Sequence, residues 1–234
     1  MPEVTFLPFR PHSEMTIYRR NMPHWRQRGC TYFITFRLAD SIPRQVLSQW
    51  REERHLWLKA HHVTDPLDRD EGMRQYLCID AAERRRFERQ QARHLHRELD
   101  RCHGACVLAA KLNRQSVEAA LHYFHGSRLW CGDFVVMPNH VHWLMTPLDD
   151  WQVEDLLQSI KRFTSTELFK HGVSNDKLWQ KESFDRIVRD RKELRAYREY
   201  IAKNPDKAKL SGASFSLHQA GWITEILKES IPSG

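Results

Sequence analysis

The stretch that most constrains the fold runs from Val135 to Met145. Two runs of apolar and β-branched residues flank Met137-Pro138-Asn139, and Pro and Asn are typical turn residues. The pattern predicts a β-hairpin whose second strand carries His140 and His142. Side chains alternate between the faces of a strand, so both imidazoles are expected on one face. Two imidazoles at this spacing could share a metal ion, and the alternative is a pair of ordinary packed histidines.

A second His-x-His pair, His94 and His96, tests how specific this spacing is. A chain with 14 histidines contains about 0.8 such pairs by chance. The second pair lies in an arginine-rich stretch that reads as helix, where residues two apart point about 200° away from each other. We therefore expect that these two residues cannot face one ion together, and the metal hypothesis applies to the strand pair.

Length and composition favour one globular domain covering residues 1–234. Hydrophobic residues make up 41% of the 234, enough for a sizeable core. No apolar run approaches 18 residues, so no membrane partner is expected. The start of the chain shows no signal-peptide pattern, which predicts a cytoplasmic, nucleoid-associated protein with reduced cysteines. Cys102 and Cys106 resemble half of a zinc site, but no second half follows.

The charge balance points to a polyanionic partner. The formal net charge is +7, and the isoelectric point is near 9.3. Nucleic acid is the most plausible partner of such a chain, and a basic surface without a partner is the alternative. The eight tryptophans and many arginines favour nucleic acid, because both side chains stack on bases.

The order of expected elements indicates an α+β fold. A ferredoxin-like or RRM-like antiparallel sheet with helices on one face accounts for the succession strand, helix, strand, strand, helix, strand, helix. Residues 1–28 read as a loop or arm, and the charged segment 65–106 reads as a helical insertion. The main expected elements are a strand from Thr31 to Leu38, a helix from Ser41 to His61, strands from Leu129 to Val136 and His140 to Thr146, a helix from Gln152 to Lys170, a short edge strand in Phe184 to Val188, and a helix from Arg191 to Lys203 that stops at Asn204-Pro205.

The last helix holds two tyrosines in different settings. Tyr197 lies between Leu194 and Ile201 at helical spacing, so core packing explains it. Tyr200 lies four residues before Asn204, and residues at this spacing are neighbours on one helix face. A metal ligand at Asn204 would therefore hold the Tyr200 hydroxyl near the same ion.

Together these motifs resemble the REP-associated tyrosine transposases, IS200-like enzymes of the single-tyrosine branch of the His-hydrophobic-His endonucleases. The resemblance runs in order from residue 23 to about residue 210 and is weak between Asp40 and Gly104. One departure is Arg186, where the family more often has Phe-Asp-His. The matching strings are Pro23-His24-Trp25, Thr31 to Asp40, Val135 to His142, Leu178 to Glu182, and Tyr200-Ile201-x-x-Asn204-Pro205.

The resemblance implies a site and a substrate. His140, His142 and Asn204 would bind a divalent metal, Mg²⁺ or Mn²⁺, although two imidazoles on chemical grounds also suit Co²⁺ or Zn²⁺. Tyr200 would be the nucleophile, and the partner would be single-stranded or hairpin DNA. Four basic residues are candidates for phosphate contacts, each also explicable as surface charge: Lys161, Arg162, Arg189 and Lys203.

Three functions follow as alternatives. The first is a metal-dependent endonuclease and strand transferase that forms a 5′-phosphotyrosine. The second is a non-catalytic protein that binds hairpin DNA or RNA and derives from a transposase. The third is a metal-dependent hydrolase in which Tyr200 is merely packed. A monomer or a homodimer fits each, and the tyrosine could serve its own chain or a partner's.

Overall fold

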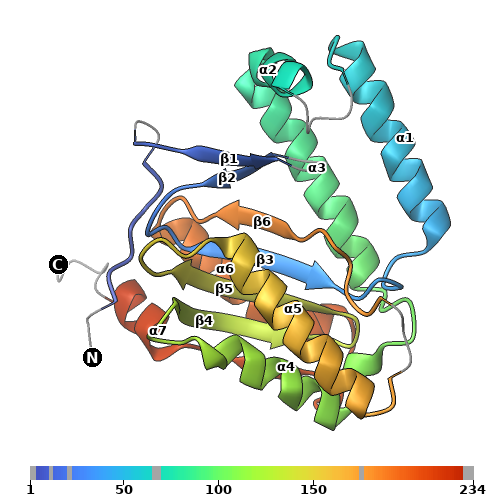
Figure 1. Cartoon of the computed structure of the whole chain (residues 1–234), viewed down its shortest axis with the longest axis vertical. Coiled ribbons are helices and arrows are strands. Elements are labelled where there is room, and N and C mark those ends of the chain that lie inside the picture. Colours follow the sequence, from blue (N-terminus) through green and yellow to red (C-terminus); the bar gives the residue numbers. More distant parts are fainter. Residues whose placement is uncertain (1–3, 11–12, 20–22, 65–69, 174–176, 229–234) are drawn as a thin grey trace.

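The computed structural model describes residues 4–10, 13–19, 23–64, 70–173 and 177–228. A five-stranded antiparallel sheet forms its centre, with the strand order β6-β3-β5-β4-β7 (Figure 1). This confirms the predicted α+β class with an antiparallel sheet. The strands are β3 (Tyr32–Arg37), β4 (Leu129–Val136), β5 (His140–Pro147), β6 (Phe184–Ile187) and β7 (Ser216–His218).

The predicted hairpin is confirmed as β4 and β5. Val135 pairs with His142 and Val136 with Val141, and the Met137 N–H donates to the His140 carbonyl at 2.8 Å to close the turn. On its other side β5 pairs with β3, where Thr35 lies opposite His142. The histidine strand is therefore in the middle of the sheet, shielded by a strand on each side.

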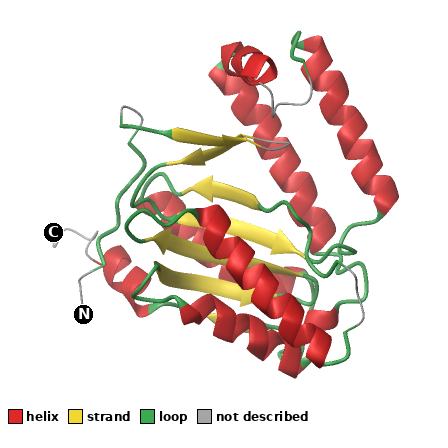
Figure 2. Ribbon diagram, viewed as in Figure 1, coloured by secondary structure: helices red, strands yellow, loops and turns green. Residues whose placement is uncertain are grey.

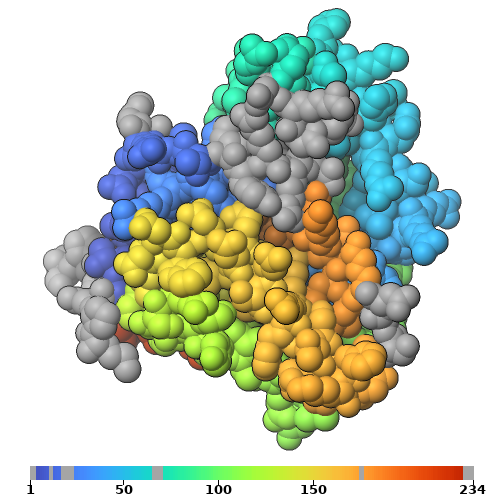
Figure 3. Space-filling view, in the orientation of Figure 1, coloured from blue at the N-terminus to red at the C-terminus, as the bar shows by residue number. Residues whose placement is uncertain are grey.

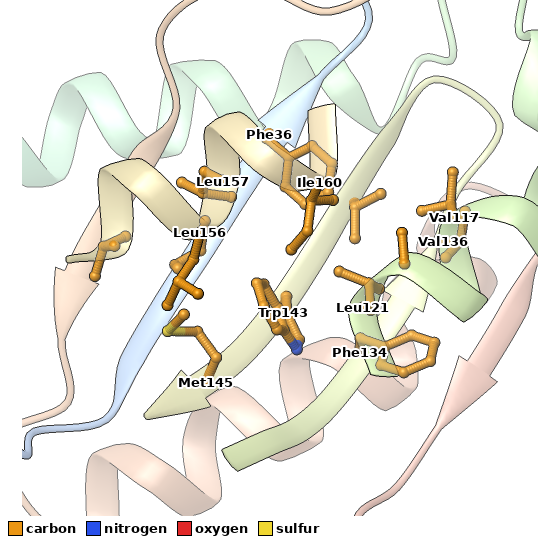
Figure 4. Close-up of a cluster of buried hydrophobic side chains, with 14 of the residues drawn as sticks. Phe36, Val117, Leu121, Phe134, Val136, Trp143, Met145, Leu156, Leu157 and Ile160 are labelled. Atoms are coloured by element: carbon orange, nitrogen blue, oxygen red, sulfur yellow. The ribbon is translucent and has the colours of Figure 1, made fainter. Parts of the chain in front are cut away.

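One face of the sheet carries the predicted helical layer. Helices α4 (Lys111–Tyr123) and α5 (Val153–Lys170) pack across it over a large apolar cluster. Figure 4 shows Trp143 at the centre of this cluster, between Phe36, Leu121 and Phe134. We refer to this side as the α4/α5 face.

The opposite face is also covered, so the expectation of helices on one face only is corrected. Helices α6 (Arg191–Lys207) and α7 (Gly221–Lys228) lie behind the sheet in the view of Figure 2. Phe33, Val135 and Leu144 point toward them, and all three are fully buried. The central strands are apolar at successive positions, a pattern typical of strands buried on both sides. We refer to this side as the α6 face.

A helical projection extends from the sheet. Helix α1 (Arg44–Ala60) follows β3, and α2 (Asp70–Cys78) and α3 (Ala81–Leu99) occupy the described part of the predicted insertion (Figure 1). Leu58, Met73 and Tyr76 form a small apolar cluster of their own between these helices. Asp80 caps α3 by accepting hydrogen bonds from the Ala82 and Glu83 N–H groups.

The N-terminal segment is more ordered than the predicted loop or arm. Strands β1 (Thr16–Arg19) and β2 (Pro23–Arg26) form an antiparallel ribbon beside β6. Arg26 makes ion pairs with Asp185 at 2.6 Å and with Glu154 at 2.5 Å, and His24 contacts the same Asp185 at 2.6 Å. These contacts with distant residues fix the ribbon, and no local pattern in the sequence indicates them.

The predicted end of the last helix is also corrected. Helix α6 continues through Asn204 and Pro205 to Lys207, and both residues are buried. The proline lies in the last helical turns, where Leu210 N–H donates to its carbonyl at 3.0 Å. Tertiary packing here outweighs the ordinary preference of a pre-proline residue for extended backbone. None of the helices in the described part of the chain is long and apolar enough to cross a membrane.

Candidate functional site

The two strand histidines meet at one point on the α6 face. His140 and His142 are both fully buried, and their Nε2 atoms lie 3.1 Å apart. Their Nδ1 atoms point the other way, to Asn139 Oδ1 at 2.8 Å and to Thr35 Oγ1 at 2.7 Å. The predicted orientation is therefore observed, and a polar neighbour behind each ring fixes how the Nε2 atoms face.

The environment keeps both rings neutral. An amide oxygen only accepts hydrogen bonds, so His140 carries its proton on Nδ1 and leaves a lone pair on Nε2. Burial lowers the pKa of His140 to about 3 and the pKa of His142 well below 6.5. A neutral imidazole with a free Nε2 and a second hydrogen bond behind it is the form in which histidine binds metal ions.

Helix α6 brings Tyr200 and Asn204 to the same point. The Tyr200 hydroxyl lies 3.4 Å from His142 Nε2. Asn204 is fully buried, and its Oδ1 atom has no hydrogen-bond partner within the described residues. Because α6 stays helical through Asn204, the four-residue spacing places the phenol and the amide on one side of the helix.

These donors fit a divalent cation. Two neutral imidazole nitrogens converge beside an amide oxygen that is buried without a partner, and such an atom is costly to leave unsatisfied. Within the described residues, no three His, Cys, Asp or Glu side chains are placed to hold an ion together. The set therefore depends on the Asn204 oxygen.

The surroundings of Tyr200 hold the phenol in its protonated form. Burial, followed by the nearby Asp100 carboxylate, raises the pKa of Tyr200, whereas the neighbouring Asn204 amide acts in the opposite direction. Lys207 places its ammonium 4.2 Å from the centre of the Tyr200 ring. Tyr197 points elsewhere and stacks on Phe33 with ring centres 4.2 Å apart, as the packing interpretation predicts.

Helix α3 contributes a third imidazole that the sequence interpretation missed. His96 has its ring centre 5.3 Å from that of His142 and 5.4 Å from that of Tyr200. Its Nε2 atom is shielded from solvent and has no partner among the described residues, and burial lowers its pKa to about 4. The prediction that His94 and His96 do not act as a pair agrees with this geometry, because His94 points toward Trp50 instead.

Asp100, just after α3, was also missed. Its Oδ1 atom accepts a hydrogen bond from Asn204 Nδ2 at 3.3 Å. A carboxylate only accepts, so the amide must turn its nitrogen toward Asp100 and its oxygen away. Asp100 therefore orients the Asn204 oxygen. His96 and Asp100 both lie in the insertion, and no residue spacing in the sequence indicates that either one lies near β5.

The four basic residues proposed for phosphate contacts do not form one surface. Lys161 and Arg162 lie on α5, on the face opposite the histidines, and the Lys161 ammonium donates to the carbonyls of Gln180 and Lys181. Arg189 is exposed just before α6, and Lys203 is exposed on α6 near Glu199. Their role stays a prediction.

On β6, Arg186 lies opposite Phe33 of β3, and its side chain forms an ion pair with Glu193 at 3.0 Å. This register places it on the α6 face, two residues from Phe184, which contacts His96. The family's usual histidine at this position would therefore occupy the same face as the candidate site.

Two comparisons with known proteins each gave one match. A sequence model of the family described as "Transposase IS200 like" matches residues 109–204. This segment of the chain is therefore similar to the IS200-like transposases. A solved structure described as "Structure of the REP associates tyrosine transposase bound to a REP hairpin" is similar over 82% of this chain and 74% of that one, with 16% identity and a TM-score of 0.41. No curated protein matches the sequence significantly.

The family match divides the site into two parts. His140, His142, Tyr200 and Asn204 lie within the matched transposase segment. His96 and Asp100 lie outside it, in or next to α3. The insertion thus adds side chains to a site whose first four residues come from the transposase segment.

Proposed function

We propose that this protein is a metal-dependent single-stranded DNA endonuclease and strand transferase that acts on hairpin DNA through a 5′-phosphotyrosine at Tyr200. The observation that carries the proposal is the position of the Tyr200 hydroxyl, 3.4 Å from His142 Nε2, where both histidine Nε2 atoms converge. Packing alone would not require a phenol, two imidazoles and an unpartnered amide oxygen to meet at one buried point.

His140, His142 and Asn204 would hold the cation, Mg²⁺ or Mn²⁺. Bound there, a divalent ion supplies Lewis-acid polarisation of the scissile phosphate. Asn139 and Thr35 fix the two rings, and Asp100 fixes the amide, so the protein holds three donor atoms ready before DNA arrives.

Tyr200 would supply the nucleophile. Its oxygen forms a bond to phosphorus while the bond from phosphorus to the 3′ oxygen breaks; the phenol loses its proton, and the departing oxygen gains one as a free 3′ hydroxyl. A tyrosine with an ordinary pKa is only about 0.1% ionised at pH 7, a deficit of about 4 kcal/mol, and burial adds to it. The Lys207 ammonium over the ring lowers that deficit as negative charge develops on the phenol.

The covalent link suits strand transfer better than hydrolysis. A phosphodiester to tyrosine keeps the chain's bond energy, so a 3′ hydroxyl of another strand can reverse the step. Tyr200 contacts His142 of its own chain, an arrangement in which one subunit suffices for the first cleavage. The net charge of +7 supports a polyanionic substrate, and the family match supports DNA.

The second candidate is a hairpin-binding protein without catalysis. The observation that favours it is the complete burial of both imidazoles, because a phosphate must come within reach of the site before any reaction. Such a protein would bind hairpin DNA equally well in the presence of a chelator and after His140→Ala.

The deciding experiment incubates the protein with Mn²⁺ and a hairpin oligonucleotide that carries a single-stranded flank and a 3′ label. A 5′-phosphotyrosine retains the labelled downstream strand, so wild type should yield an adduct that survives denaturant. Tyr200→Phe should abolish the adduct, and chelator should do the same. Tyr197→Phe is the matched control on the same helix and should keep the adduct.

Equal adduct yields from wild type and Tyr200→Phe would overturn the assignment. Cleaved DNA with no linked protein would indicate the hydrolase instead. Binding without cleavage, insensitive to chelator, would indicate the non-catalytic protein.

A further inference from the structure

A groove of about 570 Å³ lies on the α4/α5 face, between α5 and the segment that leads to β6. Two hydrogen bonds from Lys161 to the carbonyls of Gln180 and Lys181 connect its walls. Below them Trp179 Nε1 donates to Thr164 Oγ1 at 2.9 Å, and both side chains are buried. These hydrogen bonds join the two sides of the groove.

The charge of this groove has one sign. Among the residues that the structure describes, its lining includes four cations, Lys161, Arg162, Lys177 and Lys181, and no carboxylate. Arg162, Lys177 and Lys181 are exposed, so their charges face the solvent at the groove. Four like charges around one hollow favour a ligand with several negative charges, such as a phosphodiester chain.

An aromatic side chain stands at the same groove. Phe169 is 72% exposed, and it lies in the last turn of α5, a helix whose other face is apolar and buried. An exposed ring beside cations is the arrangement on which unpaired bases stack, because every base has a flat apolar face. A duplex offers no free base face at this position, so the ring favours a single strand.

The groove is distinct from the candidate catalytic site. Tyr200 and the two histidines lie on the α6 face, whereas α5 and the segment from residue 177 form the face toward the viewer in Figure 3. Lys161 and Arg162 therefore cannot contact the phosphate that Tyr200 attacks, and any nucleic acid they bind lies on the other side of the sheet.

We propose that this groove binds a single-stranded stretch of nucleic acid, with backbone phosphates on Arg162, Lys177 and Lys181 and a base on Phe169. The inference rests on the proposed function only in taking DNA as the substrate. The groove would hold an unpaired part of that DNA away from the reacting bond.

The test measures the affinity for a fluorescent oligothymidylate by anisotropy, in chelator, so that the metal site plays no part. The groove variant combines Arg162→Ser, Lys177→Ser and Lys181→Ser. The matched control removes the same one arginine and two lysines at exposed positions elsewhere: Arg51→Ser, Lys59→Ser and Lys111→Ser. Circular dichroism of all variants confirms that they fold.

We expect the groove variant to bind at least about tenfold more weakly and the control less than about threefold. Loss of three phosphate contacts should also lower the slope of log affinity against log salt by about 2, since each contact to a single strand contributes about 0.7. Phe169→Ala should weaken binding without changing this slope, and Phe163→Ala, 49% exposed on the same helix but outside the groove, should change neither.

Equal losses from the groove variant and the control would overturn the inference, since net charge alone would then explain binding. Competition by polyglutamate as effective as by unlabelled oligothymidylate would overturn it too, in favour of an acidic protein partner. Because no adduct is measured, a chain that never links to DNA can still pass this test, and a chain that forms the adduct can still fail it.

Discussion

The two faces of one strand differ in what they bury. On β3, Ile34 and Phe36 point into the α4/α5 face, where they belong to the large apolar cluster. Phe33 and Thr35 point into the α6 face, where the rings of His142 and Tyr197 lie beside them. The same extended backbone therefore supports an apolar core on one side and a polar site on the other.

The difference shows in the polar atoms that lack partners. Within the described residues, the buried His96 Nε2 atom on α3 and the buried Asn204 Oδ1 atom on α6 have no hydrogen-bond partner, and no such atom occurs in α4 or α5. Polar atoms buried in this way oppose folding. We conclude that the α4/α5 face supplies stability and that the α6 face holds groups which the fold alone does not need.

The largest effect expected from this contrast is that acid destabilises the folded protein through the buried imidazoles on the α6 face. The folded state keeps His96, His140 and His142 neutral, with pKa values lowered to about 4, about 3 and well below 6.5. The unfolded chain binds protons near pH 6.5, so stability is present above that pH and is lost as the pH falls toward the folded pKa values. From pH 7 to pH 5 the free energy of unfolding should fall by about 2 kcal/mol for each such imidazole, about 6 kcal/mol together.

Urea titrations in chelator at several pH values measure this fall. His96→Gln removes one of the three groups and should reduce the fall by about 2 kcal/mol. His55→Gln, the same change at an exposed imidazole on α1, is the matched control. Parallel pH curves for wild type and His96→Gln would mean that His96 is not held neutral in the folded state.

The second effect belongs to the α4/α5 face. Trp143 is fully buried at the centre of that cluster (Figure 4), and Trp143→Ala should lower the free energy of unfolding by about 4 kcal/mol. His142 lies one residue away and points to the other face. In chelator, His142→Ala should lower the free energy of unfolding by less than half as much, because the cavity that it creates is partly offset by the removal of a buried polar ring. Urea unfolding at pH 8 measures both, and equal costs would show that the two faces contribute alike.

The sequence predicts those parts of the molecule that depend on local pattern. The hairpin, its turn and the shared face of His140 and His142 follow from strand alternation, and the nearness of Tyr200 to Asn204 follows from helical spacing. The second helical layer was missed, although the apolar run in β4 and β5 contained the signal. The end of α6 was misplaced because the packing of Pro205 is a tertiary effect.

The contribution of the insertion could not be predicted in this way. His96 lies 44 positions before His140, and its helix shows only an arginine-rich pattern typical of a solvated surface. Which turn of α3 meets β5 depends on how the helical projection docks, and no residue spacing encodes that. The same holds for the ion pairs of His24 and Arg26 with Asp185.

The smallest effect concerns Asp100, which tests whether the insertion tunes the site. If Asp100 orients the Asn204 oxygen, Asp100→Ala should weaken Mn²⁺ binding about tenfold, equivalent to about 1.4 kcal/mol, as expected when an outer partner of a ligand is lost. Calorimetric titration with Mn²⁺ measures this without any DNA.

Asp100→Asn keeps an acceptor oxygen but removes the charge, so near-normal affinity in that variant separates orientation from electrostatic attraction. Asp155→Ala, which removes an exposed carboxylate from α5, is the matched control and should bind Mn²⁺ as wild type does. Normal affinity in Asp100→Ala would show that the amide finds its orientation without the insertion, and the transposase segment alone would then define the metal site.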